Sequence, residues 1–143
     1  MSKRANILAY NSAVIGDLAG LKTSISRRAD DFNWIACDAA ENGHLHIVEY
    51  LDYQYPNRID YNDVCVYGIS GGHEEVLKYA LSKGANQFTR FAMEAICKRH
   101  FQLFRQLMPN LIGLIDRTSY IFTELEYHQQ HKLVQELSDM LDN

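Results

Sequence analysis

Apolar residues recur along this chain in paired segments, each with the three- and four-residue spacing of an amphipathic α-helix. Segments 39–51 and 69–81 read almost alike: small residues come first, then Gly-His, and then an apolar helical stripe. When these two segments are aligned, weaker copies appear before and after them. Their anchor residues lie 27 to 30 positions apart and are Gly16, Gly43, Gly72, Arg99 and Gln129. A period of this length indicates a repeat protein built from small supersecondary units.

Each unit is predicted to be two antiparallel helices joined by a tight turn at the anchor. The first helix has its apolar stripe eight, seven and four residues before the anchor, as in Ile35, Ala36 and Ala39. The second helix has its stripe five and eight residues after the anchor, as in Val48 and Leu51. Ten residues before each anchor is a polar residue of a type that commonly caps a helix N-terminus. The predicted N-caps are Asn6, Asn33, Asn62, Thr89 and Ser119.

One helix pair cannot cover its own apolar face, whereas stacked pairs bury a continuous core. We therefore predict an all-α solenoid of helix-turn-helix repeats, about five in number, with short inter-repeat loops. A length of 143 residues is close to the roughly 150 residues expected of one domain, so residues 1–143 are predicted to form a single domain. The expected repeats are approximately 5–30, 31–58, 59–87, 88–116 and 117–143.

These motifs resemble those of the ankyrin repeat family, whose units carry a small Ala-Ala pair, a Gly-His, and an apolar helix ending in Gly-Ala-Asp or Gly-Ala-Asn. The matching residues are Ala39-Ala40 and Gly43-His44-Leu45 in the second repeat, and Gly72-His73 and Gly84-Ala85-Asn86 in the third. The family's period is about 33 residues, and its usual Thr-Pro-Leu-His opening is absent here. The resemblance implies divergent, short-period repeats similar to those of large DNA viruses and intracellular bacteria, which would bind a host protein.

The anchor and the residue after it are predicted to shape the turn. Gly16, Gly43 and Gly72 suit a left-handed backbone, whereas that conformation would strain Arg99, so we expect Arg99 to adopt another one. A histidine follows the anchor in three repeats, and its recurrence predicts a structural role in orienting the turn through bonds to loop backbone. These histidines are His44, His73 and His100.

No sequence motif here predicts catalysis or a bound cofactor. The GxSxG, P-loop, HExxH and GxGxxG motifs are all absent. The spacings His44-x-His46 and His128-x-x-His131 could suit zinc, but His44 belongs to the repeated column and the predicted turn separates the second pair. We therefore expect a protein that is not an enzyme and that carries neither a metal ion nor a cofactor.

Composition and charge exclude further classes. Hydrophobic residues make up 47% of the chain, which is typical of an ordered globular protein. A net charge of −4 argues against binding nucleic acid by phosphate neutralisation. The longest apolar run, about five residues, is far short of the roughly 18 to 20 that span a membrane, and no signal peptide is recognisable. The three widely spaced cysteines, Cys37, Cys65 and Cys97, are predicted to be reduced thiols in the core. Reduced thiols are typical of an intracellular protein, so we expect the protein to be cytoplasmic, and to lie in the host cytoplasm if it is a viral protein or a bacterial effector.

Aromatic and charged residues at columns outside the buried pattern are candidates for binding a partner. They are Trp34, Asp38, Asp63, Tyr67, Arg90, Glu94, Tyr120 and Glu124. The alternative is that the large rings only cover the seams between repeats. We predict a monomeric protein–protein interaction module that binds another protein through its first helices and adjoining loops. The alternative function is a structural subunit that self-associates or docks into a larger assembly.

Overall fold

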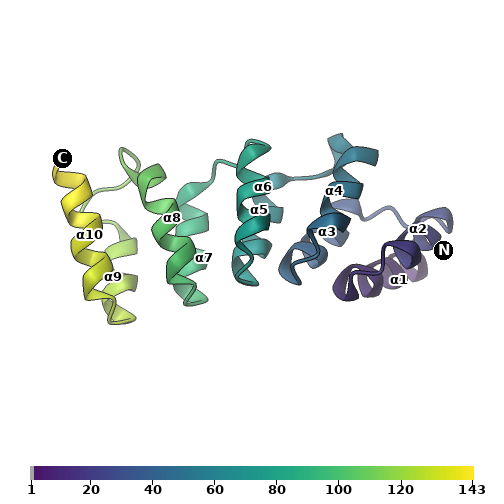
Figure 1. Ribbon diagram of the computed structural model, residues 1–143, viewed down its shortest axis with the longest axis horizontal. Helices are drawn as coiled ribbons and strands as arrows, with labels where there is room; N and C mark the ends of the chain where they lie inside the picture. The colour runs from purple at the N-terminus through teal and green to yellow at the C-terminus, as the bar shows by residue number, and fades with distance from the viewer. Residues whose placement is uncertain (1) are drawn as a thin grey trace. The chain divides into compact units, whose positions relative to one another are not determined.

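The computed structural model describes residues 2–143, and this part of the chain is all-helical. It contains ten α-helices and one short 3₁₀ helix, with no β-strand in the described range (Figure 1). The α-helices follow one another in pairs: α1 (Ser2–Ile15) and α2 (Leu18–Ser26), α3 (Phe32–Glu41) and α4 (Leu45–Gln54), α5 (Tyr61–Ser70) and α6 (Glu74–Ser82), α7 (Phe88–Cys97) and α8 (Phe101–Leu111), α9 (Tyr120–Tyr127) and α10 (His131–Asp142). The 3₁₀ helix η1 (Pro56–Arg58) follows α4.

The helices form two compact units, and the boundary lies between Asn86 and Gln87. In the first unit, α1 packs against α2 and α3, α3 packs against α4 and α5, and α5 packs against α6. In the second unit, α7 packs against α8 and α9, and α10 packs against α9 and α8. Within each unit, then, the first helices of successive pairs are neighbours.

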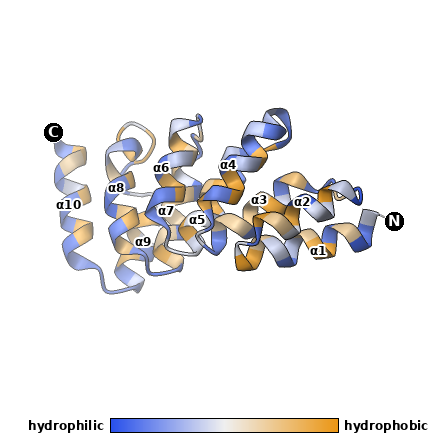
Figure 2. Ribbon diagram, turned by 45° about the vertical axis from the view of Figure 1, so that its right-hand side comes forward, coloured by the Kyte–Doolittle hydropathy of each residue, from blue (hydrophilic) through white to orange (hydrophobic). Residues whose placement is uncertain are grey.

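The predicted apolar columns form the core. In the first unit, Ile35, Ala36, Ala39, Val48 and Leu51 are fully buried, and Figure 2 shows the apolar stretches of α1 and α3 next to each other. In the second unit the largest fully buried side chains are those of Phe91, Phe104, Leu107, Ile96, Leu111 and Ile121. The helical spacing in the sequence therefore identifies the buried faces correctly.

Two residues assigned to the core are exposed. Leu8 is 40% exposed and lines a surface pocket together with Ala5 and Arg27. Cys97 is also exposed, since it is the last residue of α7, whereas Cys37 and Cys65 are buried inside α3 and α5. All three cysteines are free thiols.

The predicted N-caps are wrong for four of the five residues. These four lie inside helices, namely Asn6 in α1, Asn33 in α3, Asn62 in α5 and Thr89 in α7. The helices begin earlier than the polar column, so α5 is capped by Asp60, whose carboxylate accepts from the N–H of Asn62 at 2.9 Å. Only Ser119 caps as predicted, at the start of α9, where its hydroxyl accepts from the N–H of Ile121.

The asparagines bind the linker that follows their own helix pair. Each amide oxygen accepts a bond from a backbone N–H: Asn6 from Asp30 (2.8 Å), Asn33 from Asp60 (2.8 Å) and Asn62 from Asn86 (2.9 Å). Asn6 also accepts from the N–H of Asp31 and donates its amide to the Asp30 carboxylate. A side-chain amide can accept and donate at once, so this column ties each first helix of the first unit to the chain entering the next pair.

Replacing Asn6 with alanine should lower the free energy of unfolding by about 1–3 kcal/mol, since backbone donors beside a buried site lose their acceptor. Asn6 is 6% exposed, so water replaces its oxygen poorly. Chemical denaturation followed by circular dichroism measures the effect. Asn11→Ala, an exposed change on the same helix, should shift stability by less than about 0.5 kcal/mol. Equal losses in both variants would contradict the linker role.

A left-handed residue ends every first helix. The φ angles are 78° at Gly16, 75° at Gly43, 78° at Gly72, 61° at Arg99 and 58° at Gln129. The expectation that Arg99 would avoid this conformation is therefore wrong. In the first unit an added Cβ at Gly43 would lie 2.6 Å from the His73 ring, whereas the last pair has Gln130 in place of that histidine. The histidine that packs on the other turns is thus absent from the last pair, and the left-handed backbone itself costs Arg99 about 1 kcal/mol.

Candidate functional site

The first unit brings two of the predicted aromatic residues into contact. Trp34 lies on α3 and Tyr67 on α5, with their ring centroids 6.3 Å apart in an edge-to-face arrangement. Trp34 is 50% exposed, so the pair covers part of the seam between α3 and α5 and still presents an aromatic surface to solvent. The two rings therefore pack on each other between α3 and α5, while half of the Trp34 side chain stays exposed.

Acidic side chains accompany the aromatic pair. Trp34, Asp38 and Glu41 are four and three residues apart on α3, which places them on one face of that helix. We call Trp34, Asp38, Glu41 and Tyr67 the α3–α5 face. Burial raises the pKa of Asp38, and the nearby Glu41 raises it further.

The same negative field acts on Tyr67. Burial raises the pKa of its phenol, and the neighbouring Cys37, Glu41 and Asp38 raise it further. Neither α3 nor α5 contains a lysine, arginine or histidine. Within residues 2–143, Asp38 and Glu41 take part in no ion pair. The α3–α5 face is therefore aromatic and negatively charged.

Hydrogen bonds between the helices hold this face in place. The Asn33 amide donates to the Asp63 carboxylate at 3.1 Å, which positions that predicted residue at the start of α5. Near the other end, the Ser70 hydroxyl donates to the Glu41 carboxylate at 3.3 Å. Asp63 is thus close to the α3–α5 face, but its carboxylate is already bound by Asn33.

Helix α1 adds two exposed apolar residues next to the α3–α5 face, and neither was among the predicted binding residues. Ile7 and Val14 occupy the same columns of the repeat as Trp34 and Glu41, and both are exposed, Ile7 by 50%. Since α1 packs against α3, these apolar side chains extend the surface next to the α3–α5 face. The alignment of the repeats could have predicted the exposure of Ile7, because Ile7 and Trp34 occupy the same column.

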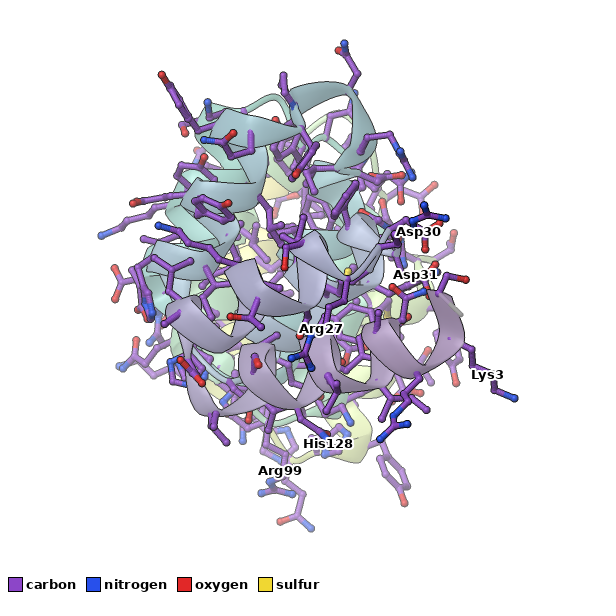
Figure 3. All side chains as sticks on the ribbon, turned by 90° about the vertical axis from the view of Figure 1, so that its right-hand side faces the viewer. Lys3, Arg27, Asp30, Asp31, Arg99 and His128 are labelled. Carbon is purple, nitrogen blue, oxygen red and sulfur yellow. The ribbon has the colours of Figure 1, made fainter. Side chains whose placement is uncertain are left out.

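Tyr10 joins α1 to the linker before α3. Its hydroxyl donates to the Asp31 carboxylate at 2.6 Å. Burial raises the Tyr10 pKa well above its usual value, and the bond to Asp31 adds to the shift. Figure 3 shows Asp31 next to Asp30 on this linker, which adds further negative charge beside α3.

The other predicted binding residues lie in the second unit. Arg90 and Glu94 are on α7 and Tyr120 and Glu124 are on α9, two helices that pack together. The Arg90 guanidinium donates to the Gln87 side chain at 3.0 Å. Tyr120 is exposed, and its hydrogen bond to Glu124 raises its pKa. These residues form no aromatic pair of the kind seen at Trp34 and Tyr67.

The repeated histidines bridge successive helix pairs. The Nε2–H of His44 donates to the Val14 carbonyl, and that of His73 to the Glu41 carbonyl, each at 3.0 Å. Since a carbonyl only accepts, Nε2 must carry the proton in each ring. The bonds reach the preceding first helix instead of the histidine's own turn. His100 follows the Arg99 turn and precedes α8.

The two histidine pairs considered for zinc differ in their surroundings. His46 donates through Nε2 to the Gly16 carbonyl at 3.1 Å, so both His44 and His46 are bound to backbone. His128 ends α9 and His131 begins α10, with the turn between them. Within residues 2–143, no group of three or more His, Cys, Asp or Glu side chains is placed to hold a metal ion.

A polar cluster around the buried Asp52 joins α4, α5 and α6 in the first unit. Asp52 on α4 is 6% exposed and accepts hydrogen bonds from the Tyr61 and Tyr79 hydroxyls, while Lys83 lies 2.8 Å away. Burial alone would raise the pKa of Asp52, but the bonds from Lys83, Tyr61 and Tyr79 lower it overall. Burial and the bond to Asp52 raise the pKa of Tyr61 to about 12. Such protonated, bound phenols join α4, α5 and α6 and are poorly suited to proton transfer at neutral pH.

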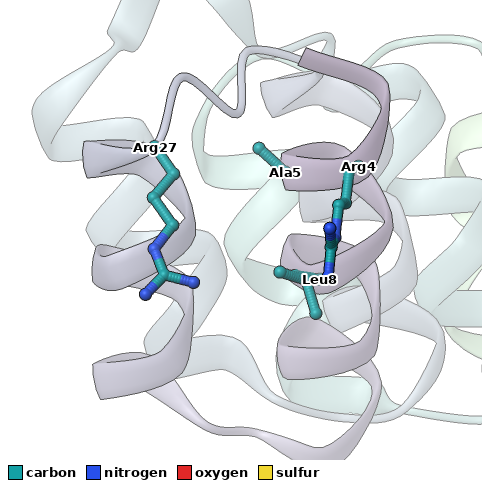
Figure 4. Close-up of a pocket in the computed structure, with 4 residues that line it drawn as sticks. All are labelled: Arg4, Ala5, Leu8 and Arg27. Atoms are coloured by element: carbon teal, nitrogen blue, oxygen red, sulfur yellow. The ribbon is translucent and has the colours of Figure 1, made fainter. Parts of the chain in front are cut away.

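A surface pocket of about 340 Å³ lies between α1 and α2. Arg4, Ala5, Leu8 and Arg27 line it, and Figure 4 shows the Arg27 guanidinium reaching from the end of α2 along the helix pair. None of the predicted binding residues contributes to it. Its charge is positive, opposite to that of the α3–α5 face, so the two surfaces would favour different ligands.

Among residues 2–143, no helix combines the length and the apolar character needed to cross a bilayer. In comparisons with known proteins, neither a family model nor a curated protein matches the chain.

Proposed function

We propose that this chain is a non-enzymatic protein–protein interaction module that binds its partner through the α3–α5 face. The observation that carries the proposal is the half-exposed Trp34, held edge-to-face against Tyr67 beside Asp38 and Glu41. Tryptophan and tyrosine are enriched among the few residues that contribute most of the binding energy in protein interfaces.

We also propose that the helix pairs are ankyrin-like repeats. Three features of the first unit support this: its first helices pack side by side, glycines in the left-handed region end them, and histidines connect each pair to the one before. In such an arrangement equivalent columns form continuous rows, which agrees with Ile7 and Trp34 both being exposed on neighbouring helices.

The way in which the face is held supports a preorganised binding surface. Asn33 fixes both the linker before α5 and the carboxylate of Asp63, and Ser70 fixes Glu41. A surface that is ordered before association loses less conformational entropy when the partner binds. The face would therefore act as a rigid scaffold whose side chains need little rearrangement.

Replacing both Trp34 and Tyr67 with alanine should reduce partner capture by about tenfold or more, as expected when interface residues of this type are truncated. Affinity capture from a cell lysate with quantitative mass spectrometry measures the loss. Tyr53→Ala removes an aromatic ring that is 83% exposed on α4 and serves as the control.

The helical circular dichroism of the double variant should stay close to that of the original protein, because Trp34 is only half-buried. If the variant unfolds more readily but captures the same partners, the rings serve the seam between α3 and α5, and the proposed function is wrong.

A structural subunit is the second candidate, and the exposed apolar side chains of α1 favour it. Ile7, Leu8, Val14 and Ile15 are all exposed, Ile15 by 71%. A second copy or a larger assembly could cover them. Sedimentation velocity distinguishes the two functions, because an adaptor remains a monomer at all concentrations, whereas a self-associating subunit sediments faster as concentration rises.

A further inference from the structure

We infer that the α3–α5 face binds a basic segment of a partner protein, in which a lysine or arginine contacts Trp34, Asp38 and Glu41 while an adjacent apolar residue contacts α1. This inference rests on the proposed function and specifies the chemistry of the partner.

The acidic residues of the α3–α5 face lack a neutralising cation on α3 or α5. Asp38 and Glu41 are three residues apart on one face of α3, and no basic residue of α3 or α5 neutralises them. Neither forms an ion pair within the described residues. Asp38 is also half-buried, where the local dielectric is lower than in water and a charge is stabilised more strongly by an opposite one. A cation from outside would provide what the chain itself does not.

The aromatic pair adds geometry to the charge. Tyr67 turns its ring at 64° to Trp34, with the centroids 6.3 Å apart, so the indole is held in a defined orientation while half of it stays exposed. Indole is the side chain that attracts ammonium and guanidinium groups most strongly through its ring face. Asp38 follows Trp34 by one helical turn, so a cation next to the indole also lies within reach of a carboxylate.

The neighbouring helix specifies the rest of the segment. Ile7 and Val14 on α1 are exposed at the columns that correspond to Trp34 and Glu41. A segment that crosses from α3 to α1 would therefore pass from an acidic and aromatic surface to an aliphatic one. A partner segment with basic and apolar residues near each other matches both the acidic, aromatic surface of α3 and the aliphatic surface of α1. An acidic segment would be repelled by the carboxylates of α3.

Trp34 is the only tryptophan of the chain, so its fluorescence reports on this face directly. The probes are two capped synthetic peptides of equal length, one alternating arginine and leucine and the other alternating glutamate and leucine. The arginine peptide should change Trp34 emission in a saturable way, and added salt should weaken its binding, because exposed ion pairs are screened. The glutamate peptide should produce no saturable change.

The variant D38N/E41Q should weaken binding of the arginine peptide by about fivefold or more, the sum expected of two partly exposed ion pairs. The matched control is E49Q/E74Q, which removes the same charge from α4 and α6 and should leave the affinity within about twofold of the original. The inference is overturned if both peptides bind equally well, or if D38N/E41Q binds the arginine peptide no more weakly than the control.

This experiment is separate from the test of the proposed function. Partner capture could depend on Trp34 and Tyr67 while the arginine peptide binds no more tightly than the glutamate peptide. The protein is then a binding module for a different kind of partner, and only the inference fails. If capture does not depend on the two rings, the proposed function fails whatever the peptides show.

Discussion

Replacing Gly71 with alanine should lower the free energy of unfolding by about 3 kcal/mol, because the new methyl group has no space. An added Cβ would lie 2.0 Å from the carbonyl oxygen of Glu41 and 2.7 Å from the His73 ring. The backbone of Gly71 is in the ordinary right-handed region, with φ −78° and ψ −9°. The cost therefore comes from forcing the end of α5 away from the end of α3.

Gly84→Ala is the matched control for this prediction. Gly84 has a φ of 97°, but an added Cβ there would meet no atom within 4 Å. Its expected cost is only the backbone strain of about 1 kcal/mol. Thermal unfolding followed by circular dichroism compares the two variants. If Gly71→Ala is as stable as Gly84→Ala, then α3 and α5 do not approach as closely as described.

Replacing Asp52 with alanine should cost about 2–4 kcal/mol, because a buried acceptor of several hydrogen bonds is removed while its donors remain. Tyr61, Tyr79 and Lys83 all bind this carboxylate. Asp52→Asn keeps an acceptor in place and should cost less than Asp52→Ala. Glu49→Ala, an exposed change on the same helix, should alter stability by less than about 0.5 kcal/mol. Chemical denaturation of the three variants checks the order, and a loss in Glu49→Ala as large as that in Asp52→Ala would contradict the role of the cluster.

The same cluster predicts a dependence on pH. The folded-state pKa of Asp52 is lowered by Lys83, Tyr61 and Tyr79 despite its burial. A carboxylate with a lowered pKa stabilises the fold fully above its unfolded value of about 4 and loses this contribution as the pH falls through its folded pKa. The difference in stability between the original protein and Asp52→Asn should therefore be constant from neutral pH to about pH 4 and should shrink below it. A difference that grows on acidification would show that Asp52 is not stabilised as a carboxylate.

Some of the candidate site could be predicted from the sequence, and some could not. The alignment of the repeats predicts that Trp34, Asp38 and Tyr67 lie outside the core, because residues outside the buried columns of a helix pair must face solvent or a neighbouring element. Ile7 and Val14 could not be identified in the same way, because single apolar residues are common on protein surfaces and do not by themselves indicate a binding surface. The register alone also did not show that Trp34 and Tyr67 meet, because side-chain direction depends on how closely α3 and α5 pack.

The hydrogen-bond partners of the repeated asparagines also could not be predicted from the sequence. An asparagine near the start of a helix commonly caps it, and the sequence contains no information on which N–H group its side chain will meet. In the structure Asn6, Asn33 and Asn62 accept from the linkers after their own helix pairs. Those linkers approach only because the pairs pack side by side, so the true partner exists only in the tertiary structure.

The sequence by itself determined that the chain forms paired helices, where the turns between them lie and which faces are buried, because these depend on the spacing of apolar residues and on local backbone preferences. Only the tertiary structure decided what the recurring polar residues bind and which exposed side chains share a surface. Hydrogen bonds and aromatic contacts need atoms within a few ångströms, and residues some 30 positions apart come that close only through packing.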